Sequence, residues 1–320
     1  MPLTEFDIIR KYFKPADRQS GEVRCGIGDD AAIVRLPAGM ELAISMDTLV
    51  AGVHFPVTTA PEDIGYKALA VNLSDLAAVG ARPAWVTLAL TMPEADSDWL
   101  SGFMKGFNQL AGDYSISLIG GDLTRGPLTI TLQIHGYLPQ NKGMLRSGAK
   151  NGDLIYVSGT LGDAGLALKA IGGEVTPASN HLSQLYMKLN RPQPRVELGE
   201  ALRDIAHSAI DVSDGLLADL GHILEDSHAG AVINTDLIPL SEALAELDRA
   251  DALQLALTAG DDYELCLTVP ADQRAIVEKT ATDLCPLTCI GRITGSEMGV
   301  VLEDSDGCPV KISGAGYRHF

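Results

Sequence analysis

The sequence has few positive charges and no long hydrophobic run. It contains 24 Lys and Arg against 42 Asp and Glu, which gives a formal net charge of −18 at pH 7. Because a nucleic-acid backbone is bound through basic surface, this balance argues against a nucleic-acid partner. No apolar stretch is long enough to span a bilayer, and the opening residues MPLTEFDIIRKYF lack the pattern of a signal peptide. We therefore expect no membrane association.

Cysteines and phosphate-binding glycine loops are also scarce. The five cysteines are an odd number without the spacing of a secreted disulfide framework, and no second pair joins Cys285 and Cys289 to complete a zinc site. This usage predicts a cytoplasmic protein. Neither GxxxxGK[ST] nor GxGxxG occurs, which excludes a P-loop and a Rossmann dinucleotide site.

The length of 320 residues predicts two domains at the usual ~150 residues each. Strand and helix patterns alternate in the first half, with strands at 85–91, 115–119 and 129–137 and a helix at 97–111. A turn-rich segment, 139–150, follows. We expect domains 1–147 and 148–320, each an α/β or α+β layer structure with a mixed sheet.

The segment 59–83 predicts a buried helix. Pro61 suits the first helical turn, and Gly80 followed by Pro83 suits its end. Apolar residues cover nearly every face between them, which is typical of a core helix. Asp75 lies on this helix, where an unpaired carboxylate would be costly. It either accepts a structural hydrogen bond, pairs with a basic residue or binds a metal.

Acidic residues recur at the ends of the predicted strands. A strand beginning at Leu42 is expected to be buried and to end on the oxygens of Ser45 to Asp47, and the strand 115–119 is expected to end at GGD. Each site alone fits an ordinary turn. Since strand ends gather at one edge of a sheet, the set together suggests convergent oxygen ligands for Mg²⁺. The positions are Asp29 and Asp30, Asp47, Asp122, Asp211 and Asp214, and Asp261 and Asp262.

Seven motifs lie along the chain in order: GIGDD (26–30), SMDT (45–48), AVNLSDLAAVGARP (70–83), GGD (120–122), RSGA (146–149), DVSDG (211–215) and GDDYEL (260–265). Together they closely resemble the thiamine-monophosphate kinases of the aminoimidazole ribonucleotide synthetase-like superfamily. The resemblance implies two α/β domains and a homodimer whose N-terminal domains form a β-barrel. It also implies ATP-dependent phosphorylation of thiamine monophosphate to thiamine diphosphate, with several Mg²⁺ ions, and it leaves a K⁺ requirement open.

The resemblance also implies roles for individual residues. The implied Mg²⁺ ligands are Asp30, Ser45, Met46 (through its backbone), Asp47, Asp75, Asp122, Asp211 and Asp214. The implied ATP contacts are Gly121, Asp122, Arg146, Ser213 and Tyr114, and the implied substrate contacts are His54, Asp261 and Tyr317. No general base is implied, because the metal cage of Asp30, Asp47, Asp75 and Asp122 carries the chemistry. On the residues alone, His54 also fits a loop histidine and Tyr317 a core tyrosine.

Three positions depart from the family pattern. The family commonly has Thr at the position of Met46, Thr at that of Leu123 and Glu at that of Asp261. Met46 suits a metal only through its carbonyl oxygen, and Asp261 reaches less far toward a substrate than Glu.

Four other functions remain open on the sequence. Selenophosphate synthesis would need a reactive Cys near the N-terminal glycines, where only Cys25 stands, in a Gly-Asp-Asp context that favours the kinase. The hydrogenase-maturation relative ends in Cys, whereas this chain ends in Phe320. A metal-dependent phosphohydrolase would release phosphate without an acceptor. A non-catalytic Mg²⁺- or nucleotide-binding dimer would bind nucleotide without turnover.

Overall fold

The computed structural model describes residues 4–14, 22–314 and 316–317. The chain divides into two compact units. Unit 1 comprises Met1–Leu76 and Ala81–Asn141, and unit 2 comprises Ala77–Gly80 and Lys142–Phe320. The division after Asn141 lies six residues before the domain boundary expected from the sequence.

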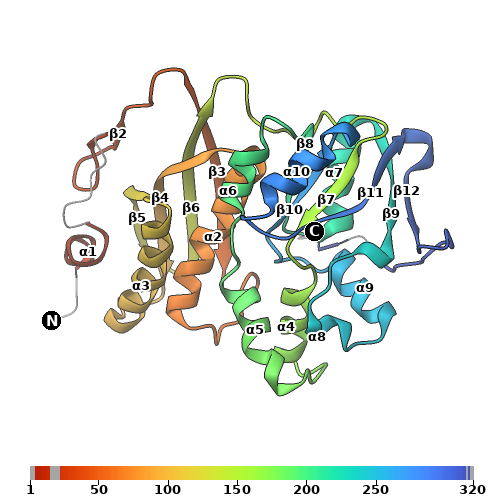
Figure 1. The fold of residues 1–320 in the computed structure, drawn as a ribbon. Coiled ribbons are helices and arrows are strands. Elements are labelled where there is room, and N and C mark those ends of the chain that lie inside the picture. Colours follow the sequence, from red (N-terminus) through yellow and green to blue (C-terminus); the bar gives the residue numbers. More distant parts are fainter. Residues whose placement is uncertain (1–3, 15–21, 315, 318–320) are drawn as a thin grey trace. The chain divides into compact units, whose positions relative to one another are not determined.

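Unit 1 is built on a mixed four-stranded sheet (Figure 1). The strand order is β3 (Met40–Val50), β6 (Thr129–Pro139), β4 (Arg82–Met92) and β5 (Ser117–Arg125). The β3–β6 and β6–β4 pairs are antiparallel, and the β4–β5 pair is parallel. This confirms the mixed sheet expected from the sequence. The other elements are β1 (Val23–Cys25), β2 (Ile33–Val34), α1 (Glu5–Ile8), the π-helical turn η1 (Ile9–Phe13), α2 (Pro61–Val79) and α3 (Ser97–Asp113).

One face of this sheet is covered by α2. Alternate residues of β6, including Ile130 and Ile134, are fully buried, while the residues between them are only half-buried. The Gly136 backbone lies against Leu76 of α2 on the buried side, because a Cβ built there would be 2.9 Å from a Leu76 methyl. The sheet therefore has a covered face under α2. The opposite face, which we call the open face, is exposed along β3 but is covered around Trp85 of β4 by a cluster that includes Val23 of β1.

Helix α2 confirms the sequence prediction. It begins at Pro61, and Gly80 closes it with a left-handed φ of +69°. Almost every side chain between them is buried, and even Lys67 is only 1% exposed. Asp75 is half-buried.

Two strand predictions for unit 1 were wrong. β3 is an exposed edge strand that continues past Asp47 to Val50, and Leu42 and Met46 on it are 45% and 60% exposed. β5 does not stop at Ile119 but runs through Asp122 to Arg125. The glycines there serve close strand approach instead of a turn, since a Cβ on Gly121 would lie 1.9 Å from a carbonyl oxygen of β4.

Unit 2 contains a six-stranded sheet in the order β12 (Val300–Glu303), β9 (Ala229–Asn234), β11 (Leu287–Gly295), β7 (Leu154–Ser158), β10 (Glu264–Val269) and β8 (Ser208–Val212). Only the β12–β9 pair is parallel. The helices are α4 (Asp163–Ile171), α5 (Ser179–Asn190), α6 (Val196–Leu202), α7 (Leu216–Ser227), α8 (Glu242–Ala245), α9 (Arg249–Thr258) and α10 (Arg274–Ala281). Short 3₁₀ turns lie at η2 (Thr235–Leu237), η3 (Ala271–Gln273) and η4 (Ser296–Met298).

Both faces of this second sheet are covered. Ile155 and Val157 of β7 belong to a buried cluster that includes residues of α7 and α9. Tyr156, between them, points the other way and donates a hydrogen bond from its hydroxyl to Glu278 of α10 at 3.1 Å. β10, the strand beside edge strand β8, is buried along its whole length.

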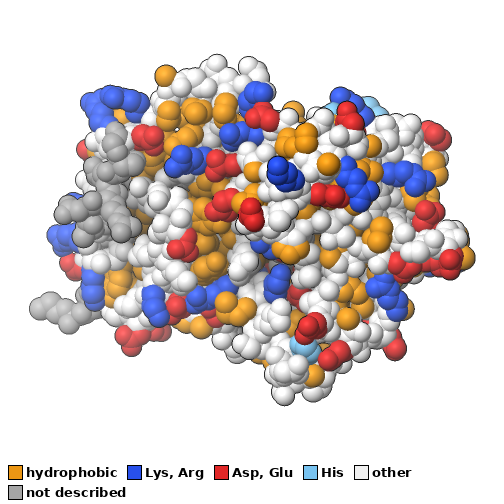
Figure 2. Space-filling model, in the orientation of Figure 1, with side chains coloured by type: hydrophobic (Ala, Val, Ile, Leu, Met, Phe, Trp, Pro, Cys, Tyr) orange, Lys and Arg blue, Asp and Glu red, His pale blue; other side chains and the backbone are white. Residues whose placement is uncertain are grey.

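The surface carries charges of both signs. On the face drawn in Figure 2, Lys and Arg side chains are interspersed with Asp and Glu. In the part of the chain that the structure describes, no helix is both long and apolar enough to cross a membrane.

Helices α2 and α3 cross at unusually close range in unit 1. A Cβ on Gly65 of α2 would lie 2.0 Å from the Phe103 carbonyl oxygen, and a Cβ on Gly106 of α3 would lie 1.8 Å from that of Glu62. The two glycines therefore let the helix backbones touch, and this contact holds α2, with Asp75, against its neighbour.

We predict that Gly106→Ala lowers the free energy of unfolding by about 2–3 kcal/mol, because the new methyl group must push the helices apart. The matched control is Gly112→Ala, at an exposed position of α3 with no atom within 4 Å of the added Cβ. That change should raise stability by about 0.5–1 kcal/mol through reduced backbone freedom in the unfolded chain. Urea unfolding followed by circular dichroism measures both, and equal effects of the two changes would contradict the close crossing.

Candidate active site

A pair of carboxylates and a hydroxyl meet on the covered face of unit 1. Ser45 and Asp47 of β3 pair in register with Ile134 and Leu132, both fully buried, so their side chains point to the same side as α2. The Ser45 hydroxyl donates a hydrogen bond to Asp75 of α2. Ser45, Asp47 and Asp75, which we call the carboxylate centre, are thus three of the predicted metal ligands that the structure brings together.

The electrostatics of this centre are unfavourable for two free anions. The pKa of Asp47 is raised to about 7, first by burial and then by repulsion from, and hydrogen bonding to, the neighbouring Asp75. A carboxylate with a pKa raised in this way binds either a proton or a cation more readily than an exposed one. Of the alternatives for Asp75, the structure therefore shows the hydrogen bond, together with a carboxylate neighbour that a cation would stabilise.

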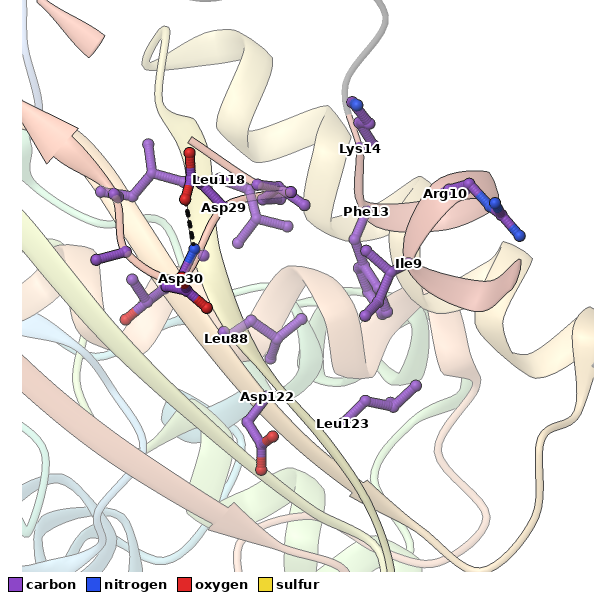
Figure 3. Close-up of a pocket in the computed structure, with 18 of the residues that line it drawn as sticks. Ile9, Arg10, Phe13, Lys14, Asp29, Asp30, Leu88, Leu118, Asp122 and Leu123 are labelled. Carbon is purple, nitrogen blue, oxygen red and sulfur yellow. Dashed lines mark hydrogen bonds between the residues drawn. The ribbon is translucent and has the colours of Figure 1, made fainter. Parts of the chain in front are cut away.

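Asp122 lies elsewhere in unit 1. It is in register with Ala89 of β4, which pairs with Thr131 of β6, which in turn pairs with Thr48 of β3. Paired residues share a face of the sheet, and the Thr48 and Thr131 hydroxyls are 2.9 Å apart. Asp122 therefore belongs to the open face and to the opposite edge strand from Asp47. In Figure 3, Asp122 and Leu123 point in different directions from β5.

A cavity of about 710 Å³ lies beside β5 in unit 1, which is a suitable volume for a nucleotide. Its walls combine apolar side chains with the loop that carries Asp29 and Asp30 and with Gly121 and Asp122 of β5 (Figure 3). Within that loop, the Asp30 N–H donates to Asp29 Oδ1 at 2.9 Å. The apolar wall includes Ile9, Phe13, Leu88, Leu118 and Leu123.

Three other predicted site residues of unit 1 do not contribute side chains to the carboxylate centre as defined above. His54 follows β3 in a loop, and its Nδ1 accepts a hydrogen bond from the Val50 N–H at 3.0 Å. Tyr114 follows α3 as its C-cap residue. Met46 faces the open side of the sheet, so only its backbone can contribute to the opposite face.

In unit 2, two turns and the C-terminal segment are joined by backbone hydrogen bonds. The Asp261 N–H donates to the Ser213 carbonyl at 2.9 Å, and the Tyr317 N–H donates to the Asp214 carbonyl at 3.0 Å. Asp211 lies on the adjoining strand β8 and is 5% exposed. The predicted residues Asp211, Ser213, Asp214, Asp261 and Tyr317 thus lie in one neighbourhood. Tyr317 is 48% exposed, so it is not a core residue.

The turn around Asp261 has a strained backbone. Asp261 and Tyr263 have φ angles of +70° and +51°, which residues other than glycine rarely adopt. The Tyr263 hydroxyl donates to Asp261 Oδ1 at 3.0 Å and fixes the carboxylate. Between them, Asp262 is buried and accepts the Gly162 N–H, at 2.8 Å from Oδ2, and burial raises its pKa. Strain of this kind persists where the surroundings determine one conformation.

A buried ion pair that the sequence did not suggest supports this turn. Arg195 binds both oxygens of Glu264 at 2.6 Å, and the Ser158 hydroxyl adds a third bond at 2.5 Å. Glu264 directly follows Tyr263 and is 2% exposed. A bidentate Arg–carboxylate pair fixes geometry as well as charge, so it anchors one end of the strained turn.

Arg146 is exposed, and its segment is fastened by α7. Ser227 Oγ accepts the N–H groups of Gly148 and Ala149, both at 3.1 Å. At the other end of α7, Asp219 accepts three backbone N–H groups of the turn 213–215. Sequence reasoning missed Asp219 and Ser227. The available signal for Asp219 was an acid in the first turn of a helix that follows an acidic motif.

The structure does not assemble a complete metal site within one unit. Among residues 4–14, 22–314 and 316–317, no three His, Cys, Asp or Glu side chains group closely enough to hold a metal ion. The carboxylate centre supplies two carboxylates and one hydroxyl, which are hard oxygen donors of the kind that Mg²⁺ prefers. Its chemistry fits Mg²⁺, with further ligands required.

Comparison with known proteins identifies the family. The AIR synthase related protein N-terminal domain matches residues 28–138, and the corresponding C-terminal domain matches residues 150–303. The thiamine-monophosphate kinase of Escherichia coli (strain K12) is 47% identical over 323 residues, covering 100% of this chain and 99% of the relative. The chain belongs to the thiamine-monophosphate kinase family. The thiamine-monophosphate kinase of Bacillus subtilis (strain 168) is 33% identical to this chain, over 99% of this chain and 100% of the relative.

Solved structures of the thiamine-monophosphate kinase family share the fold. The enzyme from Stenotrophomonas maltophilia K279a is 49% identical, with a TM-score of 0.84 over 91% of this chain and 93% of that one. The structure of AaThiL complexed with AMPPCP and TMP is 30% identical, with a TM-score of 0.77 over 92% of each chain. Hydrogenase maturation protein HypE in complex with ATP is 20% identical with a TM-score of 0.74 over 91% of this chain and 89% of that one, which shows the common fold alone.

Proposed function

We propose that this chain catalyses ATP-dependent phosphorylation of thiamine monophosphate to thiamine diphosphate, in thiamine diphosphate biosynthesis. The observation that carries the proposal is the carboxylate centre, in a chain that matches the Escherichia coli thiamine-monophosphate kinase over its whole length. AaThiL was solved with both AMPPCP and TMP, which supports an ATP-type donor and this acceptor.

The reaction needs no general base. A phosphate monoester has a second pKa of about 6, so the attacking oxygen of the acceptor is already mostly an anion near neutral pH. The site has instead to hold donor and acceptor in line and to offset the repulsion between their charges. For this task the chain offers acidic residues that gather cations, the Arg146 guanidinium as a bidentate phosphate ligand, and a fixed Asp261 carboxylate for the substrate.

We propose Mg²⁺ as the resident metal. Asp47 and Asp75 with Ser45 would hold it in unit 1, and the family resemblance adds Asp30, the Met46 carbonyl, Asp122, Asp211 and Asp214 as ligands. When bound, Mg²⁺ neutralises phosphate charge and orients the transferred group. Asp47 and Asp75 would then face a shared cation, which would offset the repulsion that, after burial, contributes to the raised pKa of Asp47.

We propose a homodimer, because the site of unit 1 is incomplete in one copy. Asp47 and Asp122 lie on the two edge strands, three strand spacings or ~14 Å apart, and on opposite faces. Two carboxylates of one Mg²⁺ have oxygens within about 4 Å of each other. One ion can therefore bind both side chains only if a second copy supplies one of them. Pairing of edge β3 with edge β5 of a partner, as in a β-barrel, would remove the separation of ~14 Å between the strands that carry the two side chains.

The surface of β3 supports the same assembly. Leu42, Ile44 and Met46 are 45%, 54% and 60% exposed in a row along this edge strand. An exposed apolar edge strand is a hazard for a monomer and a suitable surface for a partner.

All five cysteines are free thiols, which supports a cytoplasmic location.

A coupled assay tests the function. Purified protein is incubated with Mg-ATP, with and without thiamine monophosphate, and ADP and thiamine diphosphate are followed together. Equal amounts of both products, formed only with the acceptor, support the kinase. ADP without thiamine diphosphate would instead indicate a phosphohydrolase, and no ADP at all would leave only nucleotide binding.

We predict that Asp75→Asn lowers kcat by at least about 100-fold while the protein stays folded, since it removes one charge from the carboxylate centre and keeps the shape. The control is Asp98→Asn, which removes the same charge at an exposed position of α3. Steady-state kinetics, with circular dichroism as the folding check, measure both. Undiminished turnover in folded Asp75→Asn protein would refute the role of this centre.

Mixing two inactive variants tests the shared site. If Asp47 of one copy works with Asp122 of the other, a heterodimer of Asp47→Asn and Asp122→Asn copies has one intact and one doubly altered site. Co-expression in equal amounts should then restore about a quarter of wild-type activity, because half of the randomly paired dimers regain one site of two. No recovery above either variant alone would show that both carboxylates act within one copy.

A further inference from the structure

Helix α7 of unit 2 holds, at its N-terminal end, the turn that carries Ser213 and Asp214. Asp219 Oδ2 accepts the backbone N–H groups of Ser213 and Asp214, both at 3.0 Å, and of Gly215 at 3.1 Å. Asp219 is only 3% exposed. A carboxylate at this depth needs donors around it, and these three backbone groups supply them.

At its other end, the same helix holds the segment that carries Arg146. The Ser227 hydroxyl accepts the N–H groups of Gly148 and Ala149, both at 3.1 Å, and donates to the Arg146 carbonyl at 3.3 Å. This segment and Ser227 are about eighty residues apart in sequence. One hydroxyl thereby uses both its accepting and its donating capacity on a single backbone segment.

The two attachment points lie eight residues apart on one helix, or ~12 Å along its axis. Helix capping accounts only for the bond to Gly215, which is the N-cap residue of α7, because Ser213 and Asp214 precede the helix. Capping does not account for Ser227, which lies at the last residue of α7 and binds a different part of the chain. The common feature of the two is that each fastens a segment with a proposed ATP contact.

We propose that Asp219 and Ser227 are positioning residues for the nucleotide, with α7 as the brace that sets the 213–215 turn and the 146–149 segment at a fixed separation. This inference rests on the proposed function, which assigns Ser213, Asp214 and Arg146 to ATP and its metal. Neither Asp219 nor Ser227 touches the substrate in this account. They act by keeping the contacting groups preorganised, so that binding of ATP does not have to order them.

The test combines backbone exchange with kinetics on Asp219→Ala and Ser227→Ala in the full chain. Hydrogen exchange without any ligand should accelerate about 10-fold at the 213–215 amides in the first variant and at the 148–149 amides in the second, because each group loses its acceptor. The KM for ATP should rise about 10-fold in both, while the KM for thiamine monophosphate and kcat change less than about 3-fold. The control Glu225→Ala, an exposed acid on the same helix, should change none of these quantities.

The outcomes separate this inference from the proposed function. Accelerated exchange with an unchanged KM for ATP would show a purely structural cap and overturn the brace, as would unchanged exchange in folded variants. If Asp219→Ala does not fold, Asp219→Asn retains an oxygen acceptor and should show intermediate exchange and an intermediate KM for ATP. If the wild-type protein transfers no phosphate, the proposed function fails, and calorimetric titration with Mg-ATP in place of KM still decides the brace.

Discussion

Mutual repulsion between Asp47 and Asp75 is the constraint on which unit 1 depends. Neither carboxylate can move away from the other, because the elements that carry them are held in place. β3 is paired with β6 over its full length, and α2 is buried on nearly every side and pressed against α3 through glycine contacts. The cost of the two charges must then be relieved by a proton or a cation. In a chain with a net charge of −18, a rigid anionic centre of this kind concentrates cations where phosphates are to be bound.

Unit 2 reaches its arrangement by other means. Apart from Asp211 on β8, its proposed ligand groups lie on turns or loop segments. These are fixed by side chains that bond to backbone N–H groups or to one another, as with Asp219, Ser227 and the Arg195–Glu264 pair. A turn fixed at a few points keeps some freedom between them. The positive φ angles of Asp261 and Tyr263 show that the surrounding contacts hold the turn around Asp261 tightly, since such conformations persist only where neighbours impose them.

The buried helix, the mixed sheets and the family were predictable, because hydrophobic pattern, Pro61 and Gly80 are local signals and the motifs are specific in combination. The ends of β3 and β5 were not predictable from the sequence. Asp47 and the GGD motif resemble the polar and glycine residues that often end a strand. Whether a glycine ends a strand or allows a close neighbour depends on the adjacent strand, which at Gly121 is β4. Pairing order was equally invisible, so the sequence suggested one convergent edge where the sheet separates Asp47 from Asp122. Ser227 binds only backbone groups, which no residue pattern records, and for Asp219 the sequence offered only an acid in the first turn of a helix after an acidic motif.

The alternation along β3 gives this strand two independent duties. Odd-numbered positions from Ser45 to Asp47 contribute to the carboxylate centre, and even-numbered positions from Leu42 to Met46 present an exposed apolar surface. Inserting or deleting one residue near the start of β3 would exchange the two sets, turning acids outward and apolar groups inward. Such a register shift would remove the anionic centre and the apolar association surface together. Substitutions, by contrast, can alter either duty alone, so the two properties are free to evolve separately.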